Sequence, residues 1–160
     1  METQKPMLDQ QSLLQAMREV HVTYVKQQIM LLNALKDKFG SAVVDVVQQT
    51  NSKALCHVYL MQATGEGTIE DLINVLWEPL RSKGYEFTVE HSDKGVQMKC
   101  TVCPFAALYK NLGGAEWGYH LYCAADEYLV EGFNPAIGFN RTKTLMEGHD
   151  CCDHFYFMKD

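Results

Sequence analysis

The sequence predicts an α+β fold, in which a helical N-terminal half precedes an antiparallel β-sheet with helices packed on one face. Two patterns predict this class. Through residues 1–84 apolar residues recur every three or four positions, which is the period of a helix. From residue 85 onward short stretches alternate between apolar and polar residues, which is the period of a half-buried strand. We expect residues 1–160 to form one domain, with 85–160 as its Cys-rich α+β half.

Three helices are expected in the first half. The first two lie in residues 13–39 and 41–63, and Gly40 between them is a natural stop. The polar run at residues 50–52 is a candidate interruption of the second helix. The apolar stripe of the first helix could pair with the same helix of a second copy, which makes a homo-oligomer one possible state of the chain.

The third helix is expected over residues 69–84. Thr68 has the position of its N-cap, and Asp71 follows three residues later, as in a capping box. Pro79 is expected to kink or shorten this helix because proline has no N–H to donate.

The second half is expected to begin with a β-hairpin. Apolar and polar residues alternate through residues 85–91 and again through 96–102, and the turn sequence SDKG separates the two stretches. The elements expected after it are a short helix at 106–111, a helix at 116–133, a strand at 137–145 and a closing strand at 154–159.

Composition excludes several classes of function. The net charge is −6 and no run of Lys or Arg occurs, so a nucleic-acid surface is not expected. No stretch of eighteen apolar residues is present, so we expect no membrane span. The polar N-terminal residues lack the layout of a signal peptide, which favours the cytoplasm.

Cysteines are frequent for a cytoplasmic chain. A reducing compartment disfavours structural disulfides, so clustered cysteines indicate metal binding, catalysis or buried thiols. The six are Cys56, Cys100, Cys103, Cys123, Cys151 and Cys152. Taken singly, Cys103, Cys123 and Cys152 are each as consistent with a core thiol as with a functional one.

A metal site is one interpretation of the stretch GHDCCDHF at residues 148–155. His149, Cys151 and His154 are candidate ligands, and either zinc or iron would accept them. The interval from His149 to His154 has the length of a ligand pair but spans the two cysteines, and the C-x2-C at 100–103 lacks a second pair of familiar spacing. The expected cofactor is therefore none, with the metal kept as an alternative.

A thiol nucleophile is the other interpretation. Cys103 precedes a short helix, whose N-terminus would favour a thiolate. Cys152 has His and Asp neighbours that could act as a base. Asp126 is a candidate general acid or base, and Arg141 a candidate anchor for a substrate carboxylate.

Four segments resemble the L-2-amino-thiazoline-4-carboxylic acid hydrolase family. They are CPF at 103–105, CAADEY at 123–128, FNP at 133–135 and FNRTKTLMEGHDCCDHFY at 139–156. The resemblance implies a small cytoplasmic bacterial protein with a helical first half. The resemblance implies hydrolysis of a small cyclic amidine, at a carbon–nitrogen bond other than a peptide bond, in a cysteine-lined pocket.

The matching positions supply the expected site. We expect Cys152 or Cys103 as the nucleophile, with Cys123 beside them in the catalytic group, Asp126 as the general acid or base, and Arg141 as the carboxylate anchor. Substrate-binding roles are expected for Asn134, Thr142 and Thr144. The alternative is a module without catalytic activity that binds a metal or small ligand or senses thiol oxidation.

Overall fold

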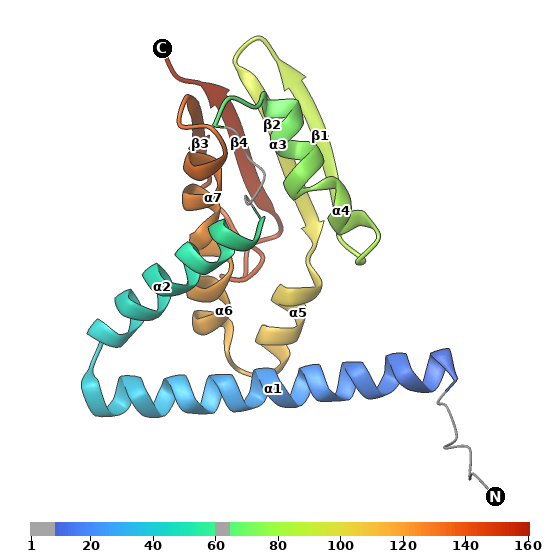
Figure 1. The fold of residues 1–160 in the computed structure, drawn as a ribbon, viewed down its shortest axis with the longest axis vertical. Coiled ribbons are helices and arrows are strands. Elements are labelled where there is room, and N and C mark those ends of the chain that lie inside the picture. Colours follow the sequence, from blue (N-terminus) through green and yellow to red (C-terminus); the bar gives the residue numbers. More distant parts are fainter. Residues whose placement is uncertain (1–8, 60–64) are drawn as a thin grey trace, which may run out of the picture.

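A long helix forms the base of the molecule in the computed structural model, which describes residues 9–59 and 65–160 (Figure 1). This helix, α1 (Gln10–Phe39), begins where the Asp9 carboxylate accepts the N–H of Ser12. It ends at Gly40, whose φ of 81° suits glycine and whose N–H donates to the Lys36 carbonyl. The predicted stop at Gly40 is confirmed.

The second helix, α2 (Ala42–Tyr59), runs without a break through residues 50–52. The interruption considered there is absent. Asn51 explains the difference, because its side-chain amide donates to the Leu121 carbonyl on another element instead of competing for its own backbone. The expected continuation of this helix through residues 60–63 lies outside the described residues.

The third expected helix is divided into α3 (Ile69–Leu76) and α4 (Glu78–Arg81). Thr68 and Asp71 form the complete capping box that the sequence predicts. The break occurs at Trp77, two residues before Pro79, because the proline nitrogen cannot continue the hydrogen-bond ladder of α3.

Four antiparallel strands form one sheet in the order β1-β2-β4-β3, which confirms the predicted α+β class. The strands are β1 (Glu86–Ser92), β2 (Gly95–Val102), β3 (Ile137–Asn140) and β4 (Cys152–Met158). β1 and β2 are the predicted hairpin. The strand expected over 137–145 is shorter than predicted, because the N–H groups of Thr142 and Lys143 donate to the Asp153 carboxylate instead of extending the ladder.

The helix expected over residues 116–133 is broken into three pieces. Its parts are α6 (Ala115–Leu121), the 3₁₀ turn η1 (Cys123–Ala125) and α7 (Asp126–Phe133). Tyr122 leaves the helical conformation with φ −125° and ψ −56°. Side chains from elsewhere take up the carbonyls of Leu121 and Cys123, so the break costs little in unsatisfied hydrogen bonds. The short helix α5 (Pro104–Asn111) precedes them.

Two apolar clusters hold these elements together. One lies between the sheet and helices α3 and α7, and includes Leu72, Met98 and Tyr156. The other joins α1 to α5 and α6 through residues such as Ile29 and Trp117. Within the described ranges, no helix is long and apolar enough to cross a bilayer.

Candidate functional site

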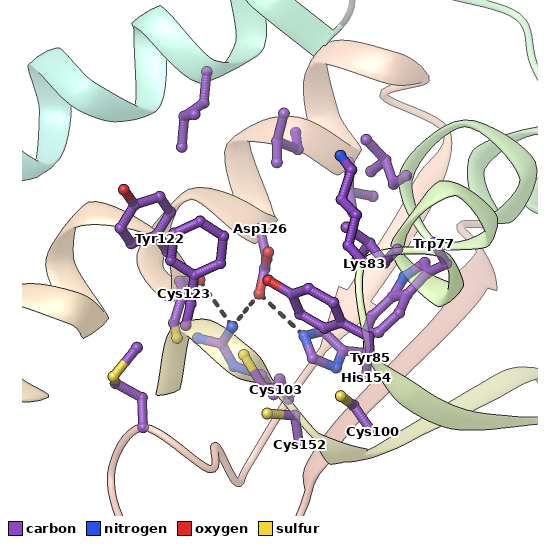
Figure 2. A pocket seen from close by; sticks show the side chains of 18 of the residues that line it. Trp77, Lys83, Tyr85, Cys100, Cys103, Tyr122, Cys123, Asp126, Cys152 and His154 are labelled. Carbon is purple, nitrogen blue, oxygen red and sulfur yellow. Dashed lines mark hydrogen bonds and ion pairs between the residues drawn. The ribbon is translucent and has the colours of Figure 1, made fainter. Parts of the chain in front are cut away.

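A cavity of about 210 Å³ lies where the two apolar clusters meet. One side is apolar, with leucines from α2, α3, α4 and α7. The opposite side carries sulfur and charge, from Cys100, Cys103, Cys123, Asp126, Arg141 and Cys152. Figure 2 shows the four cysteines and Asp126 gathered around the same space. The residue types therefore suit a small ligand that has one apolar and one polar side.

The alternation of β4 explains why its reactive groups share a face. Cys152, His154 and Tyr156 are buried and point toward the helices, whereas the residues between them are half-buried on the other face. In the register with β2, Cys152 lies opposite Cys100 and His154 opposite Met98. The sheet face thus places Cys152 and His154 on the floor of the cavity.

Asp126 is shared between two cationic or potentially cationic side chains (Figure 2). Its Oδ2 accepts from the Arg141 guanidinium and lies 3.0 Å from Nε2 of His154. A carboxylate only accepts, so Nε2 carries the proton of that hydrogen bond. The His154 ring packs edge-on against Trp77, with the ring centroids 4.8 Å apart. Asp126 and Trp77 together fix the orientation of the imidazole.

Arg141 is held on several sides. Beyond its ion pair with Asp126, it donates to the Cys123 carbonyl at 2.8 Å, and its guanidinium carbon lies 5.6 Å from the centroid of the Tyr119 ring. Its side chain is only 9% exposed. These contacts orient Arg141 within the protein and neutralise its charge.

The thiol of Cys152 differs from the other thiols of the cavity. A hydrogen bond from the Cys100 thiol lowers its pKa, opposed by burial and assisted by the Leu145 N–H at 3.2 Å and by His154. The same hydrogen bond raises the pKa of Cys100, which is also buried. Cys152 is therefore the member of this pair that takes the thiolate form.

Cys103 occupies the N-cap of α5, which begins two residues earlier than the sequence predicts. Its Sγ accepts the N–H of Ala106 at 3.4 Å, at the positive end of the helix. Burial nevertheless raises the pKa of this thiol, although hydrogen bonds from Ala106 and Tyr85 act in the opposite direction. Burial also raises the pKa of Cys123. Both thiols line the cavity in their neutral form.

Three residues expected to bind substrate are absent from the cavity lining. Asn134 donates to the Gly67 carbonyl and accepts from the N–H of Ala136, so it links two loops. Thr142 donates to Asp153, and buried Thr144 bonds to Glu147. The polar groups of all three side chains form hydrogen bonds to other parts of the protein, so the geometry does not support a contact with substrate.

The alternative metal ligands do not gather. His149 is exposed, Cys151 is buried outside the cavity lining beside Asp150, and His154 bonds to Asp126. Over the described ranges of the chain, no group of three or more His, Cys, Asp or Glu side chains is arranged to hold a metal ion. Adjacent Cys151 and Cys152 thus have different surroundings, since β4 begins at Cys152 and Cys151 precedes it.

A family model described as L-2-amino-thiazoline-4-carboxylic acid hydrolase matches residues 7–156. The chain belongs to this family. The match spans both halves of the fold, including the helical half, which contains none of the four segments that carry the sequence resemblance. Membership in the L-2-amino-thiazoline-4-carboxylic acid hydrolase family supports a hydrolase-like function. A search of curated proteins finds no match to the chain.

For this member of the hydrolase family, the contribution of the first half to the cavity lining was not predicted from the sequence. Trp77 and Lys83 line the cavity from the end of this half, and Tyr85 follows them just before β1. His154 was considered as a metal ligand and as one of the neighbours of Cys152 that could act as a base, but its hydrogen bond to Asp126 was not predicted. Its position two residues after Cys152 in a strand was the available signal, because residues i and i+2 share a face.

Proposed function

We propose that this chain is a thiol-dependent hydrolase that opens a small cyclic amidine, with Cys152 as the nucleophile. One observation carries the proposal: among the cysteines that line the cavity, Cys152 is the one whose surroundings favour the thiolate. The thiolate is the nucleophilic form of cysteine. It faces a cavity of about 210 Å³, a volume suited to a compact ligand.

The reaction begins with addition of the Cys152 thiolate to the amidine carbon. A carbon–sulfur bond forms, and the electron pair of the C=N bond moves to nitrogen, which takes a proton. When the C=N bond re-forms, the bond from this carbon to the leaving ring heteroatom breaks, and the heteroatom departs with a proton. Water then adds to the same carbon. Loss of the hydroxyl proton creates the carbonyl group and releases Cys152 as a thiolate.

Asp126 and His154 are the proposed proton-transfer pair. Their hydrogen bond of 3.0 Å shares one proton beside the thiol, and their side chains line the same cavity. The pair gives a proton to the leaving heteroatom and recovers one from the water-derived hydroxyl group. The ion pair with Arg141 keeps Asp126 in place through both steps.

Lys83 replaces Arg141 as the proposed anchor for an anionic group on the substrate. Arg141 is already paired with Asp126, whereas Lys83 lines the cavity and forms no ion pair or side-chain hydrogen bond within the described part of the chain. Figure 2 shows the Lys83 side chain above the thiols, on the opposite side of the cavity. A substrate carboxylate held there would leave the rest of the molecule facing Cys152.

The test uses 2-aminothiazoline-4-carboxylate and follows ring opening by proton NMR. Wild-type protein is expected to turn it over, and C152S to lose at least about 100-fold in kcat. The matched control is C151S, which removes the adjacent buried thiol outside the cavity lining and should retain activity. Acid quenching should trap a covalent adduct on Cys152, detectable by peptide mass spectrometry. Full activity of C152S would overturn the nucleophile, and absence of wild-type turnover would overturn the substrate class.

A further inference from the structure

The long helix α1 has two faces of different character. Val25, Ile29 and Leu32 are buried against α5 and α6. Hydrogen bonds from Tyr109 to Gln28 and from Trp117 to Asn33, both 2.7 Å, fix the same side. In Figure 1 the other elements lie on one side of α1 and leave its far side uncovered.

The uncovered face carries a seam with alternating spacings of three and four residues, which is the heptad spacing of a coiled coil. Its positions are Gln10, Leu13, Met17, Val20, Tyr24, Gln27, Leu31 and Ala34, and all of them are exposed. The five large apolar side chains among them are between 48% and 69% exposed. The buried contacts to the body lie on the opposite side of the helix, and at the edge of the seam Gln28 and His21 contact α5.

Charge is missing from this face. None of the seam positions from 10 to 34 holds Asp, Glu, Lys or Arg, and neither do the flanking positions 14, 16, 21, 23, 28 and 30. A helix exposed to water usually places charges beside an apolar stripe. Depletion of charge together with exposed apolar side chains is typical of the core of a protein interface.

We propose that this seam is a dimer interface, occupied by α1 of a second copy in antiparallel orientation. A two-fold axis requires the seam to be complementary to itself. With Val20 opposite Tyr24 of the second copy, Leu13 lies opposite Leu31, and every apolar seam residue is covered. A parallel pair would instead place Lys38, the next seam position, against its own copy.

The size of the interface is adequate. The five large seam side chains and the flanking Leu14 and Met30 each offer on the order of 60 Å² of apolar surface, so a pair of helices buries roughly 800 Å² of apolar surface. With the polar atoms of the same face, the total approaches the lower limit of specific interfaces, about 1,000 Å². No residue of α1 lines the cavity, so the dimer is independent of the proposed hydrolase function.

Sedimentation equilibrium of the full chain between about 1 and 100 µM tests the proposal. Wild type is expected to be a dimer. V20E and Y24K are each expected to weaken it by on the order of 100-fold, because each buries an unpaired charge. V46E is the matched control, since Val46 is equally exposed but lies on α2. Circular dichroism checks that each variant remains folded.

Mixing V20E with Y24K tests the orientation. In the antiparallel register Glu would face Lys across the two-fold axis, and a heterodimer should form. A parallel pair does not bring these positions together, so failure of the mixture to dimerise would overturn the register. A wild-type protein that stays monomeric at all concentrations would overturn the interface. A monomer that binds phosphatidylcholine vesicles through this face would overturn it too, as would a V20E variant that dimerises with unchanged affinity.

Discussion

Cys100 and Cys152 lie directly opposite each other on β2 and β4, and interaction with the Cys100 thiol lowers the pKa of Cys152 at the floor of the cavity. The Cys100 thiol also donates to the Val102 carbonyl at 3.3 Å. When Cys152 is ionised, the charged sulfur is the stronger acceptor. Cys100 therefore supports the thiolate without itself being the nucleophile.

The first prediction concerns C100A. Loss of the hydrogen bond should raise the pKa of Cys152 by about one unit, because a donor to the charged form has been removed. The pH dependence of iodoacetamide labelling at Cys152, followed by mass spectrometry, measures this shift. C151A is the control and should leave the profile in place. An unchanged profile for C100A would show that the opposed thiol has no influence.

The second prediction concerns Lys83. K83M should raise KM by about 10- to 100-fold and change kcat little, because the cation holds the substrate without taking part in bond making. K83R should restore much of the affinity, since it returns the charge. K94M, at an exposed lysine in the β1–β2 turn, should behave as wild type. An equal rise of KM in K83M and K94M would contradict a specific role of Lys83 and indicate a general effect of charge.

The third prediction concerns the Asp126–Arg141 pair. D126A leaves a guanidinium that is only 9% exposed without its anion, and should lower the free energy of unfolding by about 3 kcal/mol. The double variant D126A/R141M removes both charges and should recover part of that loss. Urea denaturation at pH 7 measures both proteins. No recovery in the double variant would mean that the loss came from packing.

The fourth prediction separates a structural from a binding role for Asn134. N134A should lower the free energy of unfolding by about 1–3 kcal/mol, because the Gly67 carbonyl and the Ala136 N–H lose their partner. KM should remain at the wild-type value when assayed well below the unfolding temperature. A raised KM with unchanged stability would restore the substrate contact expected from the family resemblance.

The fifth prediction is a loss of stability in alkali. Burial raises the pKa of Cys123 and of Tyr156, so both stay protonated in the folded protein while the unfolded chain releases those protons. The unfolded state then binds fewer protons, and the free energy of unfolding falls as pH rises above about 9, by up to about 1.4 kcal/mol per pH unit for each group. Urea titrations at pH 8, 9.5 and 10.5 measure the slope. C123A should make it shallower, and a flat profile would contradict the neutral burial of these groups.

Local patterns accounted for most of the fold. The stop at Gly40, the capping box at Thr68 and the β1–β2 hairpin depend on neighbouring residues, and each was predictable. The break at Tyr122 was not, because the side chains that take up the freed carbonyls come from Asn51 and Arg141, far away in the sequence.

The candidate site was predictable to a similar extent. Cys103, Cys123, Asp126, Arg141 and Cys152 were singled out from the sequence and all line the cavity, although their chemical roles remain a prediction. Asn134 and Thr144 illustrate the limit. A family motif contains residues that shape loops as well as residues that meet a ligand, and only their hydrogen-bond partners distinguish the two.

The strand order has a consequence for how the protein folds. β4 follows β3 in the chain but lies between β2 and β3, so without it the sheet is a hairpin and a detached strand. Its pairing with β2 joins residues more than fifty positions apart, a contact that forms late because a long loop must close first. Cys152 and His154 arrive with this strand. The reactive thiol and its imidazole neighbour therefore come together only in the step that completes the sheet, and partly folded chains lack the assembled site.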